Sequence, residues 1–208
     1  MASGIIIALN ATVTADDDGI CQAQTAKTLT INGSLTSGGA YSAGTNWGQK
    51  VKITSAADES GKTFDLTGVF FASDTVSDYT TTMSLTGPNA SSVTSSLYAA
   101  SISAIVASTT TAGNVSVGPT ATGASLPQIT KHGSLYQGVY GGTIGGASLE
   151  VQRYQADMAQ WVALDSDQTA AAVRNYELLV GTSVRLVPSS MSTTSQVSVV
   201  LEPINKSS

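Results

Sequence analysis

Apolar and polar residues alternate in many short segments of this chain, and turn-forming residues separate the segments. Residues 79–85, for example, place Tyr79, Thr81, Met83 and Leu85 on one side of an extended chain. Successive side chains of a β-strand point to opposite faces, so a period of two predicts half-buried strands. In the first half of the chain, the predicted strands are residues 28–32, 51–54, 63–67, 79–85, 101–106 and 114–118.

A second set of predicted strands follows a stretch without periodicity. Residues 119–133 show no alternation and include two of the five prolines of the chain. Proline-containing segments without a pattern are typical of linkers between domains. The second set comprises residues 135–140, 149–153, 161–164, 176–178, 184–186 and 197–201, and a helical turn is expected only at residues 168–174.

These elements predict an all-β protein with two consecutive antiparallel β-sandwich-like domains. Short strands separated by glycine, proline and Asx turns are typical of sandwiches and barrels. The composition agrees, because threonine, valine and tyrosine favour strands and only 11% of the residues are charged. We expect an N-terminal arm or first strand at residues 1–26, a first domain at 27–118, a linker at 119–133 and a second domain at 134–208.

The N-terminal arm contains an apolar run that includes Ile5, Ile6, Ile7 and Leu9. The run is too short for the core of a signal peptide or for a membrane span, so we expect no membrane insertion. Its burial therefore requires protein contacts, and two interpretations stay open. The run packs on a neighbouring subunit as an assembly contact, or it forms an ordinary first strand of its own domain.

The charge of the chain restricts its partners. The net charge is −5 and there is no run of lysine or arginine, whereas binding to phosphates needs a basic patch. We therefore expect no nucleic-acid partner. Few charged residues also leave a monomer with little to prevent association, so we expect copies of the protein or other proteins to cover much of its surface. The alternative is that serine and threonine hydroxyls solvate the exposed strand faces.

Residues that commonly carry catalysis or bind metals are scarce. The chain has one histidine, His132 in the predicted linker, and one cysteine, Cys21, and catalytic triads and zinc sites need more partners than these. Asp16, Asp17 and Asp18 would offer oxygen ligands to calcium, but adjacent acids point in different directions, and a solvated turn is the other interpretation. The remaining carboxylates mostly occupy predicted turns. We expect no enzymatic activity, no cofactor and no metal site.

The two tryptophans receive different interpretations. Trp161 lies in a predicted strand and is expected in the core. Trp47 lies between Gly44 and Gly48, which indicates a surface loop. An exposed aromatic ring on a β-sandwich is suited to stacking on sugar rings or packing on a partner, so Trp47 is the candidate residue for a ligand or partner contact.

Several segments resemble small structural proteins from the virions of tailed bacteriophages. They are residues 19–25, 29–39, 51–61 and 101–118, so the resemblance spans about residues 19–118. Residues 149–201 resemble, more loosely, the decoration or fibre-attachment domains of such phages. The resemblance implies a β-sandwich component of the particle, on the capsid or around the head–tail junction. The shared pattern consists of turns and strands and carries no catalytic residues.

The expected function is therefore that of a structural protein of a bacteriophage particle, located in the virion. It would be a capsid decoration protein or a ring or appendage subunit at the head–tail junction. Its partners would be copies of itself and other virion proteins, such as capsid, portal or tail proteins. The alternative function is a tail-fibre or receptor-binding module that recognises a cell-surface glycan, and a small glycan-active enzyme is a third.

Overall fold

The computed structural model describes residues 7–12, 15–44, 47–71, 79–130, 134–141, 148–165, 170, 172–189 and 196–204. The described residues form an all-β protein whose strands pair in antiparallel fashion, which confirms the prediction of an all-β fold. The helical content of this part of the chain is one short 3-10 turn, Ala156–Met158. No described helix is long and apolar enough to cross a membrane.

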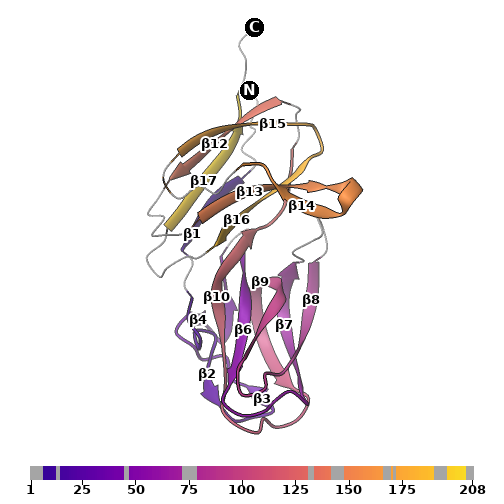
Figure 1. The fold of residues 1–208 in the computed structure, drawn as a ribbon. Helices are drawn as coiled ribbons and strands as arrows, with labels where there is room; N and C mark the ends of the chain where they lie inside the picture. The colour runs from indigo at the N-terminus through magenta and orange to yellow at the C-terminus, as the bar shows by residue number, and fades with distance from the viewer. Residues whose placement is uncertain are drawn as a thin grey trace.

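The lower part of the molecule in Figure 1 is one curled sheet of nine strands. Its strands pair in the order β2-β10-β6-β9-β5-β4, with β3 and β7 also paired to β9 and β8 paired to β7. The long β9 pairs with β6 through its first half and with β7 through its second half, so the sheet curls around it. The strands are β2 (Cys21–Gln24), β3 (Thr28–Leu29), β4 (Thr36–Ser37), β5 (Ala40–Ser42), β6 (Trp47–Ser55), β7 (Thr63–Phe71), β8 (Tyr79–Thr86), β9 (Ser92–Ala107) and β10 (Val115–Ser125).

The predicted alternation is visible in the core of this curled sheet. Phe64 and Leu66 of β7 are buried, while Thr63, Asp65 and Thr67, which alternate with them, are exposed. Burying one large apolar side chain contributes about 1.5–3 kcal/mol to folding. The same core takes in Val51 and Ile53 of β6, Met83 and Leu85 of β8, and Ile102 and Ile105 of β9.

The upper part of the molecule consists of two four-stranded antiparallel sheets (Figure 1). Tyr136, Tyr176 and Leu178 from one sheet share a core with Leu149 and Leu186 from the other. The first sheet has the order β1 (Ile7–Thr12), β17 (Gln196–Pro203), β12 (Ser134–Gly141) and β15 (Ala172–Leu178), and the second has the order β11 (Gln128–Ile129), β16 (Ser183–Ser189), β13 (Ser148–Gln155) and β14 (Gln160–Ala163).

The helical turn expected at residues 168–174 is wrong where the structure describes it. Ala172, Val173 and Arg174 lie in β15 and pair with Tyr140, Val139 and Gly138 of β12. Alanine favours a helix locally, but pairing along β12 outweighs that preference here. The rest of the predicted turn lies partly outside the described residues.

Strand β1 is the first described strand of the chain, and it belongs to the upper sheets. It pairs with β17 over six residues, from Ile7 opposite Leu201 to Thr12 opposite Gln196. The next described strand, β2, belongs instead to the curled lower sheet. The first upper sheet is therefore built from strands that are far apart in the sequence, which period-two alternation does not reveal.

The segment predicted as a linker contains paired strands. Residues 119–125 continue β10, and Gly123, Ala124 and Ser125 pair with Gln49, Gly48 and Trp47 of β6. The pairing register shifts between Pro119 and Gly123, and such an irregularity interrupts the alternation that sequence reading relies on. The description of residues 119–133 as an aperiodic linker is therefore wrong for β10 and for β11.

Trp47 and the end of β10 join the lower and upper parts. Trp47 begins β6 of the lower sheet, yet its ring lies in the upper core with Tyr136, Leu149 and Leu186. A Cβ atom on Gly123 would lie 2.2 Å from Cζ2 of Trp47, so only glycine fits opposite this ring. A second contact stacks Phe71 on Tyr98, with ring centroids 5.4 Å apart, next to Ala124 and Val187.

Candidate functional site

The sequence-based prediction that Trp47 lies on the surface is wrong. Only 1% of its surface is exposed, because its ring is enclosed by the upper core. The neighbouring glycine serves packing: a Cβ atom on Gly48 would lie 2.4 Å from Cε1 of Phe71. A glycine that lets another side chain approach closely and a glycine in a surface loop look alike in sequence. Trp47 is not available to a ligand or an outside partner in this structure.

Two of the four predicted assembly residues lie in the described structure. Ile7 and Leu9 belong to β1, where they stand opposite Leu201 and Val199 of β17. Ile5 and Ile6 lie outside the described residues. Ile7 and Leu9 therefore lie in a strand, but that strand pairs with the C-terminal β17 and not with a strand of residues 27–118. Its contact with a neighbouring subunit stays a prediction.

The acidic turn packs against the lower sheet. Asp17 pairs with Lys52 of β6, and the N–H of Asp16 donates to the carbonyl oxygen of Pro119 over 3.2 Å. The Ser34 hydroxyl donates to Asp16 over 2.7 Å and lowers the pKa of Asp16, while a side-chain hydrogen bond to Asp16 raises the pKa of Asp18. The described residues contain no group of three or more potential metal ligands. These contacts explain the turn as a structural element.

Glu59 is a fully buried carboxylate that fastens two loops together. It accepts hydrogen bonds from Nζ of Lys62 over 2.6 Å and from the N–H groups of Ala112 and Gly113 over 3.1 and 2.9 Å. Burial alone would raise the pKa of Glu59, but these hydrogen bonds outweigh it and lower the pKa. A carboxylate so engaged holds the loop between β9 and β10 in place.

Cys21 and His132 do not form a site in the described structure. Cys21 is buried in the lower core, and burial raises its pKa to about 11. A thiol with such a pKa is protonated at neutral pH and is a poor nucleophile. His132 lies outside the described residues.

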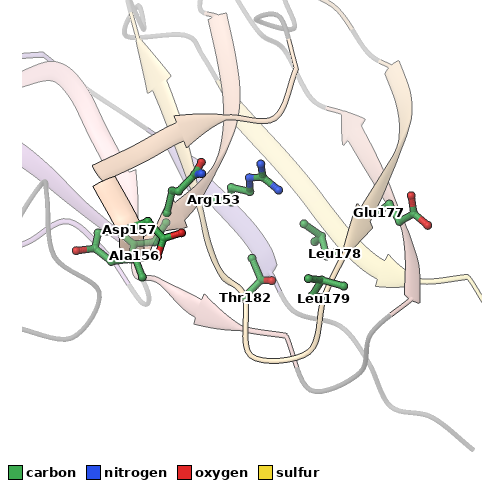
Figure 2. A pocket seen from close by; sticks show the side chains of 9 residues that line it. Arg153, Ala156, Asp157, Glu177, Leu178, Leu179 and Thr182 are labelled. Atoms are coloured by element: carbon green, nitrogen blue, oxygen red, sulfur yellow. The ribbon is translucent and has the colours of Figure 1, made fainter. Parts of the chain in front are cut away.

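A pocket of about 250 Å³ lies in the upper part, where β13, the 3-10 turn and the β15–β16 turn meet (Figure 2). One wall comes from the end of β13 and the 3-10 turn, and the other comes from the end of β15 and the residues that follow it. The lining residues are Arg153, Tyr154, Gln155, Ala156, Asp157, Glu177, Leu178, Leu179 and Thr182.

Hydrogen bonds to backbone groups fix both walls of this pocket. The hydroxyl of the buried Thr130 accepts a hydrogen bond from the N–H of Thr182 over 2.8 Å and donates one to the carbonyl oxygen of Leu179. On the other wall, the N–H of Ala159 closes the 3-10 turn onto Ala156 over 3.1 Å. The turns are thus held in shape before any ligand arrives, which lowers the entropy lost on binding.

An aromatic cluster stiffens the sheet beside the pocket. Trp161 meets the ring of Tyr154 edge to face, with centroids 5.4 Å apart, and the guanidinium of Arg185 lies 4.3 Å from the centre of the Trp161 ring. Nε of Arg185 also donates to Gln152 over 2.8 Å. Trp161 was expected in the core, but it is only partly buried, with Arg185 over its ring.

Sequence reasoning did not find the pocket. Its charged residues lie on β13, the 3-10 turn and β15, and no motif or spacing connects them. Comparison of the chain with protein-family models, curated proteins and solved structures gave no match.

Proposed function

We propose that this protein is a structural subunit of a tailed bacteriophage particle, either a capsid decoration protein or a ring or appendage subunit at the head–tail junction. It acts by binding copies of itself and other virion proteins. The resemblance of residues 19–118 to small virion proteins supports the proposal, as does the low share of charged residues, 11%. No catalytic chemistry is required of it.

In this proposal, the lower and upper parts are two β-sandwich-like domains. The curled sheet around β9 forms the first domain, and the two four-stranded sheets form the second. The second domain then includes β1 in addition to residues 134–208, because β1 pairs with β17. The shared burial of Trp47 would make the pair one rigid unit, as a subunit of an ordered assembly requires.

The observation that carries the proposal is the edge strand β8. Among the described residues it pairs with β7 on one side and with no strand on the other. Its sequence, Tyr-Thr-Thr-Thr-Met-Ser-Leu-Thr, contains no charge and no proline. Soluble proteins normally protect such edges with lysine, proline or a bulge, because unpaired backbone groups attract another strand. The pairing of β8 with β7 shifts register once, between Thr67 and Phe70, but an edge of eight residues without lysine or proline is suited to pairing with a partner strand.

A lysine on β8 tests this proposal. Thr82 is exposed on β8, and Thr67 is exposed directly opposite it on the inner strand β7. Thr82→Lys places a charge at the edge, whereas Thr67→Lys places the same charge on the same sheet away from the edge. We expect Thr82→Lys to shift the protein from multimers to monomers in light scattering, and Thr67→Lys to leave the multimers intact.

Two results would contradict the proposal. One is a wild-type protein that stays monomeric at high concentration and does not bind purified phage particles that lack it. The other is a multimer that both lysine variants weaken equally, because that outcome would reflect general destabilisation of the sheet rather than loss of an edge contact.

A further inference from the structure

We propose that β8 pairs with β8 of a second copy of this chain, in antiparallel fashion and with the pairing centred on Ser84. This inference rests on the proposed assembly function and names the partner of the edge described above. In Figure 1, β8 lies at the margin of the lower part, and β7 is the described strand with which it pairs. A second copy that pairs along this margin continues the curled sheet.

The pairing segment is the regular part of β8, Thr82–Thr86. It keeps one register against β7, from Thr82 opposite Thr67 to Thr86 opposite Thr63. The register shift of this strand pair lies beyond the segment, between Thr67 and Phe70. Because a bulge disrupts pairing and twists an edge away from partners, the regular segment is the part of β8 that a second strand can follow.

Three residues of this segment direct their backbone groups away from β7. The N–H of Gly87, just after β8, donates to the carbonyl oxygen of Lys62, just before β7, over 2.9 Å. Neighbouring residues of an antiparallel strand direct their backbone groups to opposite sides. The N–H and C=O groups of Thr86, Ser84 and Thr82 therefore point to the open edge, where no described strand meets them.

A local contact supports this orientation. The Thr80 hydroxyl donates to the carbonyl oxygen of Thr82 over 2.9 Å and accepts a hydrogen bond from the N–H of Thr82 over 3.3 Å. The backbone groups of Thr82 thus bond to a side chain of their own strand rather than to β7. The second of these bonds is long for an N–H···O hydrogen bond, and a partner strand replaces both with ladder hydrogen bonds.

The side chains of the segment are self-complementary. Its sequence, Thr-Met-Ser-Leu-Thr, reads as hydroxyl, apolar, hydroxyl, apolar, hydroxyl from either end. An antiparallel copy centred on Ser84 places Ser84 opposite itself and Thr82 opposite Thr86, so all three outward-facing residues of both copies are paired. Cross-strand pairs of threonine and serine are favourable. Met83 and Leu85, which belong to the lower core, then stand opposite each other and continue the apolar face from one copy to the next.

The charges near this edge permit pairing with an identical strand. In such a pair a charge at the centre meets the same charge of the other copy, and like charges directly opposite are destabilising. Strand β8 contains no charged residue. Asp65 of β7 lies opposite Ser84 and accepts a hydrogen bond from its hydroxyl. The two Asp65 residues of the pair are three strand spacings apart, about 14 Å, which exceeds the Debye length of about 8 Å at physiological salt.

The symmetry of this contact limits its size. Both copies use the same edge, so the contact closes at two chains, and further assembly on a particle uses other surfaces. A strand of a different protein has no reason to match a segment that reads the same in both directions. The palindromic pattern therefore favours a second copy as the occupant of the edge.

The test is cysteine crosslinking of the full-length protein with a reagent that joins thiols up to about 8 Å apart, the separation of diagonal cross-strand pairs. Ser84→Cys should give a crosslinked dimer, because each thiol faces its counterpart. Thr82→Cys and Thr86→Cys should each give none alone, because like positions lie four residues apart along the strands, about 13 Å. An equimolar mixture of these two variants should crosslink. The native Cys21 is buried, so the wild type measures the background.

Thr67→Cys is the control on the same face of the sheet, because Thr67 lies opposite Thr82 on the inner strand β7. It should give no crosslink, and circular dichroism shows whether each variant keeps its fold. Self-pairing is overturned if Ser84→Cys gives no dimer, or if Thr82→Cys or Thr67→Cys alone crosslinks as well as Ser84→Cys does. If Thr82→Lys still disperses the multimers in that case, the edge binds a different strand and the assembly function stands. If Thr82→Lys leaves them intact, the assembly contact at β8 fails as well.

Discussion

Removal of the Trp47 ring should destabilise the upper part of the molecule, although Trp47 belongs to a strand of the lower sheet. The ring is 1% exposed and packs with Tyr136, Leu149 and Leu186. Replacing a buried tryptophan by alanine costs about 3–5 kcal/mol. Nε1 of Trp47 has no hydrogen-bond partner among the described residues, and removing a buried unpaired N–H returns about 1–3 kcal/mol. From the middles of these two ranges, the expected net loss for Trp47→Ala is about 2 kcal/mol.

Trp47→Phe should be less destabilising than Trp47→Ala. Trp47→Phe keeps most of the ring and removes the unpaired N–H of Trp47, so we expect its stability to lie within about 1 kcal/mol of the wild type. In both variants Trp161 is the remaining tryptophan, and it lies in β14 of the upper part. Its fluorescence therefore reports directly on the unfolding of the upper sheets.

Urea unfolding followed by Trp161 fluorescence measures the effect. With a denaturant dependence of about 2 kcal/mol per molar urea, Trp47→Ala should lower the midpoint by about 1 M relative to Trp47→Phe. Ile53→Ala in the Trp47→Phe background is the control, because Trp161 is again the remaining tryptophan and Ile53 is fully buried on the same strand but in the lower core. We expect it to shift the Trp161 transition less than Trp47→Ala does. An unchanged Trp161 midpoint in Trp47→Ala would refute the conclusion that this ring belongs to the upper core.

Three further predictions concern other parts of the chain. Glu59→Gln should cost about 2–3 kcal/mol at pH 7. Folding lowers the pKa of Glu59, so the ionised carboxylate contributes fully to stability above its unfolded pKa, and this contribution is lost as pH falls through its folded pKa. The melting curves of Glu59→Gln and the wild type should therefore converge in acid. Gly118→Ala should lower the melting temperature, since its Cβ would lie 1.7 Å from the carbonyl oxygen of Asp16, whereas Gly61→Ala, with no atom within 4 Å, should not. Deleting residues 1–14 removes β1 from β17, and we expect a lower midpoint of the Trp161 transition; light scattering then shows whether the multimer also dissociates, as an assembly contact at Ile7 and Leu9 requires.

The strands themselves could be predicted from the sequence. Alternation in β7 and β8 is a local property, because the apolar side chains must reach one core while Asp65 and Ser84 between them stay in solvent. The scarcity of charged residues and of catalytic residue types is also a property of the sequence, and it favours the expectation of protein–protein contacts over that of catalysis.

Pairing partners and burial across the two parts were decided only by the tertiary structure. The apolar run that includes Ile7 and Leu9 does not say that β17 is its partner, because antiparallel pairing follows from backbone hydrogen bonds between distant segments. The glycine-flanked sequence around Trp47 indicated a surface loop because the second core that encloses the ring is contributed by residues more than eighty positions away. The pocket is a further example, because its walls come together only where β13 and β15, from different sheets, end side by side. Local pattern determines which residues form strands, and long-range packing determines what those strands bring together.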